Sequence, residues 1–289
     1  MTQTFSPLTI AKALNAAEVF TGPYELVGTT TEQRSLVQAL PAYYRRYDTD
    51  SYGFAAATAD EINAQLARAG FDIRLHCWSE SLSNFGIAGI TDVTVNWQTP
   101  GGLTTIAPDS GERYPGFILG SAQASRIVKI DEFLEPIVQV FTVEGLDLRI
   151  VIAPEPDSQL NLMRTARILH EADISHRDIV AYSACIPMVK LDEQPDISWL
   201  VGLSLKVASG PAWQVVQARQ QVKFGMNQYG ARAREATAAA VMKGISRERH
   251  YIVDRPFLVT IGLPDLDVPL FGAYITPESW ADPGNLSAL

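Results

Sequence analysis

The separation of helical and strand periodicity along this chain constrains its fold more than any other feature. In the first 70 residues, apolar side chains recur at helical spacing, and the next long helical pattern comes only near residue 160. Ser6 and Pro7 form a typical helix start, and Gly70 follows the last turn of a helical pattern. These patterns predict helices over 7–17, 31–47, 59–69 and 158–170, with a short helix over 196–201.

Between and after these helices, the sequence has the period of β-strands. Ile73, Leu75 and Cys77 face one way in one alternating segment, and Pro154 stops an apolar run. The predicted strands are 72–78, 91–97, 127–130, 137–143, 146–153, 179–186, 203–207, 215–226, 257–263 and 269–275. A helix-rich first third followed by a β-rich remainder indicates an α+β fold. Since no shift in composition divides the chain, we expect a single domain over 1–289.

Charge and composition exclude several classes of function. The 289 residues contain 23 Lys+Arg against 32 Asp+Glu, so neither nucleic acid nor an anionic membrane is an expected partner. No apolar run reaches the roughly 18 residues that a membrane-spanning helix requires. The first residues lack the pattern of a secretory signal, which predicts a cytoplasmic protein, or an extracellular one if a signal peptide has been removed. Cys77 and Cys185 alone form neither a disulfide framework nor a structural zinc site, and no cofactor or metal is expected.

Two polar clusters were candidates for catalytic or metal chemistry. His170 and His176 are six residues apart, whereas a helical zinc site needs a spacing of four, so a charged helix end in solvent is favoured. His76 and Cys77 could serve as base and thiol, but neighbours on a strand point to opposite faces, and a buried, structural Cys77 is favoured. The G-x-S-x-G pattern of a serine nucleophile is absent. We therefore expect no catalytic residues and no enzyme, with an unrecognised hydrolase as a distant alternative.

The segment 230–243 is compatible with more than one conformation. Its alanine-rich sequence has the local propensity of a surface helix. In strand periodicity, small residues dominate both faces, and Glu235 is the exception on the face that it shares with Ala231, Ala233 and Thr237. Such a strand could enter between two existing strands without steric conflict. A segment compatible with coil, helix or inserted strand is typical of a switching loop.

Five short motifs, in order along the chain, resemble those of the serpin family. They are the helix start at 5–10, the strand 148–154, the segment 185–191, the hinge region 227–237, and the closing strands 254–258 and 269–272. The closing pair, Asp-Arg-Pro-Phe-Leu and Pro-Leu-Phe-Gly, is the most specific of these motifs. Each motif alone could arise by chance, but five motifs in the order that serpins have are harder to explain by chance.

The resemblance implies helices packed on three mostly antiparallel or mixed β-sheets, with an exposed reactive-centre loop over about 230–249. In inhibitory serpins a target protease cleaves this loop and is trapped as an acyl-enzyme, while the loop inserts into the large sheet as a new strand. The implied hinge residues are Gly230, Ala231, Ala233, Glu235 and Thr237. The implied reactive bond region is Met242, Lys243, Gly244, Ile245 and Ser246.

The partner that the resemblance implies is a protease. A trypsin-like protease, which has an acidic specificity pocket, is the natural target if the chain is cut after Lys243. Counting forward from Gly230 and back from Pro256 places the cut near Gly244 or Ile245 instead, and a subtilisin-like target stays open. The inhibitor is expected to be a monomer.

Two departures from the serpin pattern bear on the function. The chain is shorter than a typical member, mainly between Phe5 and Trp97, and Arg232, Arg234 and Glu235 interrupt the small residues of the hinge. A buried, unpaired Glu235 would cost several kcal/mol. A dozen inserted residues at roughly 0.5–1.5 kcal/mol per hydrogen bond could outweigh this cost, but slow insertion would leave a substrate. The sequence thus predicts a suicide-substrate protease inhibitor, with a non-inhibitory serpin-fold binding or scaffold protein as the alternative.

Overall fold

A computed structural model describes residues 2–44, 52–78, 85–90, 93–120, 124–174, 177–210, 212–231 and 250–286. The chain forms two compact units, and each unit is assembled from separate stretches of sequence. The first comprises Met1–Phe5, Thr94–Asp192 and Lys223–Leu289, and the second comprises Ser6–Val93 and Glu193–Val222. The single domain over 1–289 that the sequence analysis expects stays a prediction.

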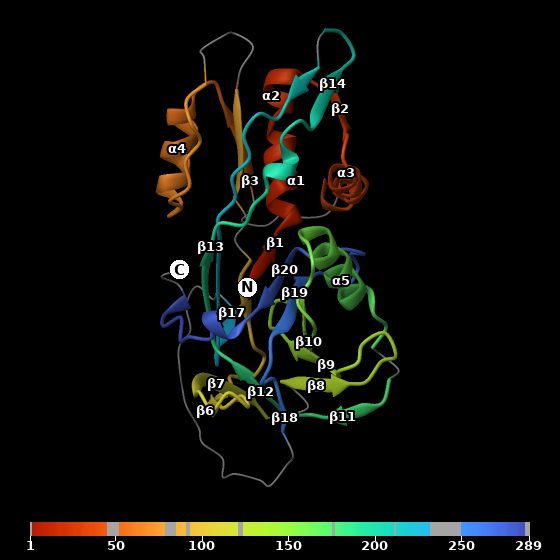
Figure 1. Cartoon of the computed structure of the whole chain (residues 1–289), viewed down its shortest axis with the longest axis vertical. Coiled ribbons are helices and arrows are strands. Elements are labelled where there is room, and N and C mark those ends of the chain that lie inside the picture. Colours follow the sequence, from red (N-terminus) through yellow and green to blue (C-terminus); the bar gives the residue numbers. More distant parts are fainter. Residues whose placement is uncertain are drawn as a thin grey trace. The chain divides into compact units, whose positions relative to one another are not determined.

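The first unit is built on a seven-stranded sheet with the order β1-β20-β19-β10-β9-β8-β11 (Figure 1). The strands are β1 (Gln3–Phe5), β8 (Ser125–Val128), β9 (Ile137–Phe141), β10 (Asp147–Ile152), β11 (Ile179–Ala181), β19 (Phe257–Gly262) and β20 (Phe271–Ile275). All neighbours in the sheet pair antiparallel. Every residue of β10 and β19 is buried, as their central positions require. The corresponding sequence predictions are confirmed to within a few residues.

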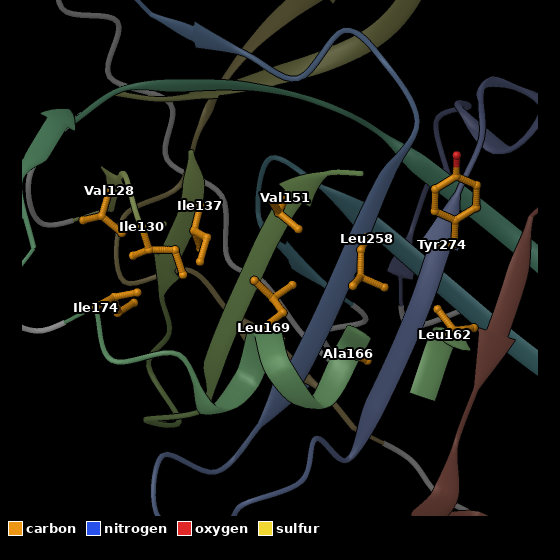
Figure 2. Close-up of a cluster of buried hydrophobic side chains, with 10 residues drawn as sticks. All are labelled: Val128, Ile130, Ile137, Val151, Leu162, Ala166, Leu169, Ile174, Leu258 and Tyr274. Atoms are coloured by element: carbon orange, nitrogen blue, oxygen red, sulfur yellow. The ribbon is translucent and has the colours of Figure 1, made fainter. Parts of the chain in front are cut away.

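One helix packs against this sheet. The helix α5 (Gln159–Glu171) begins after Ser158, whose hydroxyl oxygen accepts the backbone N–H of Asn161. Its apolar side chains, three to four residues apart, share one face. They join side chains of β8, β9, β10, β19 and β20 in a buried core of Val128, Ile130, Ile137, Val151, Leu162, Ala166, Leu169, Ile174, Leu258 and Tyr274 (Figure 2). The predicted helix over 158–170 is confirmed.

Two four-stranded sheets complete the first unit, with the orders β18-β12-β7-β6 and β13-β16-β17-β5. Their strands are β5 (Val95–Asn96), β6 (Gly102–Ile106), β7 (Tyr114–Leu119), β12 (Ala184–Pro187), β13 (Val189–Glu193), β16 (Val222–Asn227), β17 (Gly230–Ala231) and β18 (Tyr251–Ile252). A 3-10 helix, η2 (Pro277–Ser279), follows β20. In the first of these sheets, β18 runs parallel to β12. The strands of both sheets position the candidate functional site.

The second unit contains most of the helices. Its described elements are α1 (Pro7–Ala16), α2 (Glu18–Thr21), β2 (Tyr24–Val27), α3 (Thr31–Tyr44), β3 (Tyr52–Ala56), α4 (Ala59–Arg68), β4 (Gly86–Ile90), η1 (Ser198–Leu200), β14 (Ser204–Val207) and β15 (Trp213–Gln214). The helix α1 packs against the antiparallel pair β3-β4. A Cβ atom at Gly53 would lie 1.9 Å from the carbonyl oxygen of Lys12, and one at Gly89 would lie 2.1 Å from that of Thr9. These glycines therefore allow the close approach of α1.

Some predicted strands are interrupted. The segment 91–97 contributes β5 and an isolated bridge between Trp97 and Thr142, and 179–186 divides into β11 and β12. Residues 72–78 and 215–221 lie outside any described β-strand. As a result, the described strands form five separate sheets, where the resemblance implied three. The α+β class is as predicted.

Two predictions about single residues are wrong. Cys77 is exposed, because the segment that carries it is not covered on both faces, whereas Cys185 is buried. His170 is only 4% exposed, because the last turn of α5 faces the loop after β19 rather than solvent. Separately, no helix in the described part of the chain is long and apolar enough to cross a membrane.

Candidate functional site

The chain enters the predicted reactive loop through a strand that is already part of a sheet. Gly230 and Ala231 form β17, which lies between β16 and β5. Ala231 is opposite Met226 on one side and Val95 on the other, and both pairings are antiparallel. The side chain of Ala231 is 1% exposed. The first two hinge residues thus have strand neighbours on both sides.

Gly230 is required by the close approach of β5. A Cβ atom at this position would lie 2.2 Å from the carbonyl oxygen of Val95 and 3.2 Å from the Cα atom of Asn96. Backbone atoms cannot move aside as the end of a side chain can. The glycine therefore lets the hinge lie between two strands.

Gly230→Ala is expected to weaken or displace β17. Overpacking of this kind costs about 1–3 kcal/mol, and we expect that loss in the free energy of unfolding. Hydrogen exchange at the Ala231 amide should accelerate in parallel. Gly102→Ala is the matched control, because a Cβ atom there would have no neighbour within 4 Å. Equal stability and equal exchange in the two variants would contradict this role of Gly230.

The turn that precedes β17 is held by Trp97. The indole Nε1–H of Trp97 donates to the carbonyl oxygen of Asn227 (2.9 Å), and its backbone N–H donates to that of Tyr229 (3.1 Å). The backbone N–H of Gly101 donates to the carbonyl oxygen of Gln228 (2.7 Å). Three successive carbonyl groups of the turn are therefore fixed by the chain that follows β5. Sequence reasoning missed this role of Trp97, which looked like one apolar residue of an alternating strand.

The other end of the predicted loop is anchored in a different sheet of the same unit. The backbone N–H of Tyr251 donates to the carbonyl oxygen of Ser183 (2.8 Å), and that of Val253 donates to Cys185 (2.9 Å). The hydroxyl of Ser183 is hydrogen bonded to Nδ1 of His250. The chain is thus tied down on both sides of residues 232–249, by β17 at one end and β18 at the other. This serine–histidine contact was not predicted.

Most of the predicted site residues lie outside the described residues. Gly230 and Ala231 are described and lie together in β17. The other hinge residues, Ala233, Glu235 and Thr237, fall outside the described ranges. So does the reactive bond region of Met242, Lys243, Gly244, Ile245 and Ser246.

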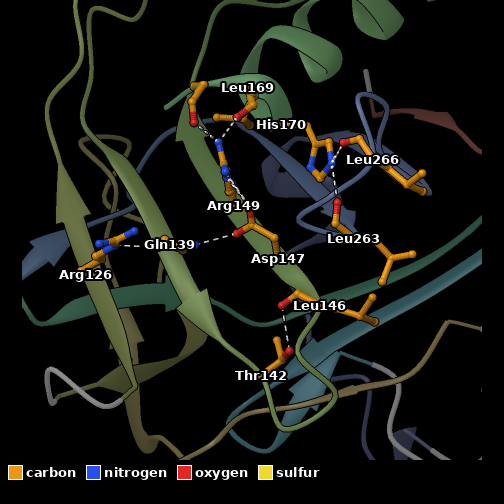
Figure 3. Close-up of polar contacts among 11 residues, drawn as sticks. Arg126, Gln139, Thr142, Leu146, Asp147, Arg149, Leu169, His170, Leu263 and Leu266 are labelled. Carbon is orange, nitrogen blue, oxygen red and sulfur yellow. Dashed lines mark hydrogen bonds and ion pairs between the residues drawn. The ribbon is translucent and has the colours of Figure 1, made fainter. Parts of the chain in front are cut away.

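A buried network of polar side chains joins three strands of the seven-stranded sheet to α5 (Figure 3). The Arg149 guanidinium donates to the Asp147 carboxylate through Nε (2.7 Å) and lies 2.6 Å from it through Nη2. Its Nη1 donates to the carbonyl oxygens of Leu169 (2.8 Å) and Ala172 (2.6 Å) at the end of α5. Gln139 donates to Asp147 (2.8 Å). Arg149 therefore satisfies a buried carboxylate and the last carbonyl groups of a helix together.

The candidate residues for hydrolase chemistry, His170, His76 and Cys77, do not have the neighbours that a catalytic base or nucleophile would need. Nε2 of His170 lies 3.1 Å from the carbonyl oxygen of Leu263 and 2.9 Å from that of Leu266 (Figure 3). This arrangement suits a neutral ring that donates from Nε2. The backbone of His76 is bonded to Gln217, and Cys77 is exposed. Among the described residues, no group of three or more His, Cys, Asp or Glu side chains could hold a metal ion.

The stability of the protein is expected to fall as the pH falls through the range in which unfolded histidine titrates. Burial is the main cause that lowers the pKa of His170 below its usual value. The unfolded chain then binds a proton that the folded chain does not, so stability is lost below about pH 6.5. His170→Gln should reduce the fall in melting temperature between pH 7.5 and 5.5. His76→Gln, at an exposed position, is the control, and an equal change in both variants would contradict this assignment.

Comparison with known proteins identifies the fold. No protein-family model matches the chain, and no curated protein sequence matches it. Among solved structures it is similar to Serpin48, described as a highly specific serpin of the insect Tenebrio molitor, with a TM-score of 0.59 and 13% identity. This match covers 95% of the present chain and 91% of the other.

A second similar structure is thyroxine-binding globulin in complex with thyroxine, with a TM-score of 0.52 and 11% identity. That match covers 95% of the present chain and 92% of the other. A structure of the human protein in the same complex gives a TM-score of 0.51 at 11% identity. The chain therefore has the serpin fold, as its motifs predicted.

Proposed function

We propose that this protein inhibits a protease as a suicide substrate, by cleavage of the loop after β17 and insertion of that loop as a new strand. The observation that carries the proposal is the position of β17. Gly230 and Ala231, the first two residues of the hinge, are already paired between β16 and β5. They form the first part of the strand that the loop would add on insertion. Cleavage of the loop beyond the hinge would free the remaining hinge residues to extend this pairing with β16 and β5.

The register of β17 determines which residues would pair during insertion. Met226 is opposite Ala231 in an antiparallel pair. Each later residue of the loop would therefore pair with the residue one position earlier in the segment that precedes Met226. Glu235 would then lie opposite Val222, and Thr237 opposite Gln220. Because opposed residues share a face, Glu235 would be on the face of the buried Ala231. The register thus supports the prediction that Glu235 points inward and slows insertion.

The proposed reactive bond lies within residues 242–246. If the chain is cut after Lys243, the target is a trypsin-like protease, whose acidic pocket binds the ammonium group. Cleavage at Gly244 or Ile245 would fit a subtilisin-like target better. In either case we propose that one monomer acts on one protease, with no cofactor.

Incubation with a trypsin-like protease is expected to give a covalent complex that survives denaturing electrophoresis. The acyl-enzyme bond is retained because insertion distorts the protease before deacylation. Lys243→Ala should abolish the complex with a trypsin-like protease, whereas Lys206→Ala, an exposed lysine of β14, should leave it unchanged. Clean cleavage without any complex, by trypsin-like and subtilisin-like proteases alike, would reject the inhibitor and favour the non-inhibitory binding or scaffold protein. Hydrolysis of ester or peptide substrates by the protein alone would favour the hydrolase.

A further inference from the structure

The second unit contains an apolar cavity with a volume of about 120 Å³. Its walls come from α1, α4, β4 and two extended segments, residues 71–75 and 215–221, and every residue of the lining belongs to this unit. Buried aliphatic side chains form much of the lining, among them Leu14, Ile62, Leu66 and Leu203, each at most 4% exposed. An apolar cavity of such a size stays dry and can bind a small apolar group.

The wall formed by residues 71–75 is fixed from two sides. Asn63 of α4 donates from Nδ2 to the carbonyl oxygen of Leu75 (3.0 Å), and its Oδ1 accepts the backbone N–H of the same residue (2.8 Å). From the opposite segment, Oε1 of Gln221 accepts the backbone N–H of Asp72 (2.7 Å). The cavity is therefore preformed, and a ligand would not have to order this wall on binding.

The cavity is positively charged where its lining meets solvent. Within the described lining, the residues exposed to solvent are Arg74 and Arg219, and no aspartate or glutamate is present. Nη1 of Arg74 donates to the carbonyl oxygens of Phe71 (2.9 Å) and Ile73 (2.8 Å), which also line the cavity. These two bonds hold the Arg74 guanidinium beside the apolar walls.

The acidic residue near this border does not neutralise it. Asp196 lies close enough to Arg219 for the arginine to help lower the pKa of its carboxyl group. The main cause of that lowered pKa, however, is the backbone N–H of Ser198, which donates to Asp196 (2.8 Å). Asp196 is outside the cavity lining. The cavity thus combines an apolar interior with a cationic border, and this combination suits a ligand with an apolar chain and an anionic head group.

We propose that this cavity binds a short-chain aliphatic anion, such as a monocarboxylate of about six carbon atoms. The volume determines the length of the chain, because a cavity of about 150 Å³ accommodates benzene and the present one is slightly smaller. The carboxylate would lie beside Arg74 and Arg219, whose guanidinium groups can each pair with it through two hydrogen bonds. All of the lining lies outside residues 230–249, so the site is independent of the loop that the proposed inhibition uses.

Hexanoate is the probe, and its binding is measured on the intact protein by NMR of the isoleucine methyl groups. The signals of Ile10 and Ile62, which line the cavity, should shift, whereas that of Ile179, exposed in β11, should not. From butanoate to hexanoate the dissociation constant should fall about fourfold for each added methylene group. Acetate and inorganic phosphate, which have no chain, should leave both signals unchanged. If hexanoate shifts neither signal, or acetate shifts both equally, the site is rejected.

Arg219→Gln is expected to weaken hexanoate binding about fivefold, because it removes one of the two cationic groups at the border. Arg68→Gln is the matched control, since Arg68 is an exposed residue of α4 outside the lining and the change in net charge is the same. Binding of 1-hexanol, which has no charge, should be equal in the two variants. Equal affinities of the two variants for hexanoate would contradict the role of Arg219.

Ala13→Leu tests the apolar part of the site, because it adds a larger side chain to the lining from α1. This variant should lose hexanoate binding while its melting temperature shows that it is folded. If Ala13→Leu is folded and binds hexanoate as tightly as the wild type, the anion is held adventitiously at the surface and the proposal is rejected. Should Ala13→Leu fail to fold, the dependence of affinity on chain length in the wild type decides the same question.

Discussion

Arg149→Met is expected to lower the free energy of unfolding by about 3–5 kcal/mol, because it leaves the buried Asp147 carboxylate without its ion pair. The side chains of Arg149 and Asp147 are 9% and 4% exposed. The same substitution removes the donor to the carbonyl oxygens of Leu169 and Ala172. Gln139 would be left as the main partner of the carboxylate. Methionine fills much of the space, so the loss is mainly electrostatic.

Thermal or urea unfolding measures this effect, and α5 supplies its control. Arg167 and Glu171 form an ion pair at 2.6 Å with exposed side chains, so Arg167→Met should cost no more than about 0.5 kcal/mol. Replacing both buried partners, with Arg149→Met and Asp147→Leu, should recover part of the lost stability. If Arg149→Met is as mild as Arg167→Met, the buried network does not stabilise the contact between α5 and its sheet.

Much of the fold could be predicted from local periodicity. The helical pattern over 158–170 predicted the helix α5, and the mainly apolar segments 146–153 and 257–263 predicted β10 and β19. The same information failed for 72–78 and 215–221. Both segments were predicted as strands, but a sequence pattern indicates which side chains are buried and not which backbones pair. In this protein, backbone groups of residues 72–78 are hydrogen bonded to the side chains of Gln217 and Gln221. Hydrophobic periodicity cannot predict such side-chain partners.

The candidate site could be predicted only in part. The motif around Gly230 identified the start of the hinge, and the structure places it between two strands. The role of Trp97 depends on contacts with residues about 130 positions away, and sequence spacing does not contain such contacts. The burial of His170 was missed for the same reason, since its partners Leu263 and Leu266 belong to a distant loop.

Cleavage of the loop is expected to raise the melting temperature by about 10–20 °C. About ten net hydrogen bonds of roughly 1 kcal/mol each would form on insertion. Burial of Glu235 would offset several kcal/mol of this gain, which leaves about 5 kcal/mol. For a protein of this size, each kcal/mol shifts the melting temperature by about 2–4 °C. Gly230→Ala should reduce the gain, because the inserted strand would begin from a strained position.

The direct test is the melting temperature of the wild-type protein before and after a single cut within residues 242–246, with the site of the cut mapped by mass spectrometry. Insertion of the loop beside β16 predicts that the cut protein melts at least about 10 °C higher than the intact one. A cut protein that melts at or below the temperature of the intact one would contradict the account, because no strand would then have been added.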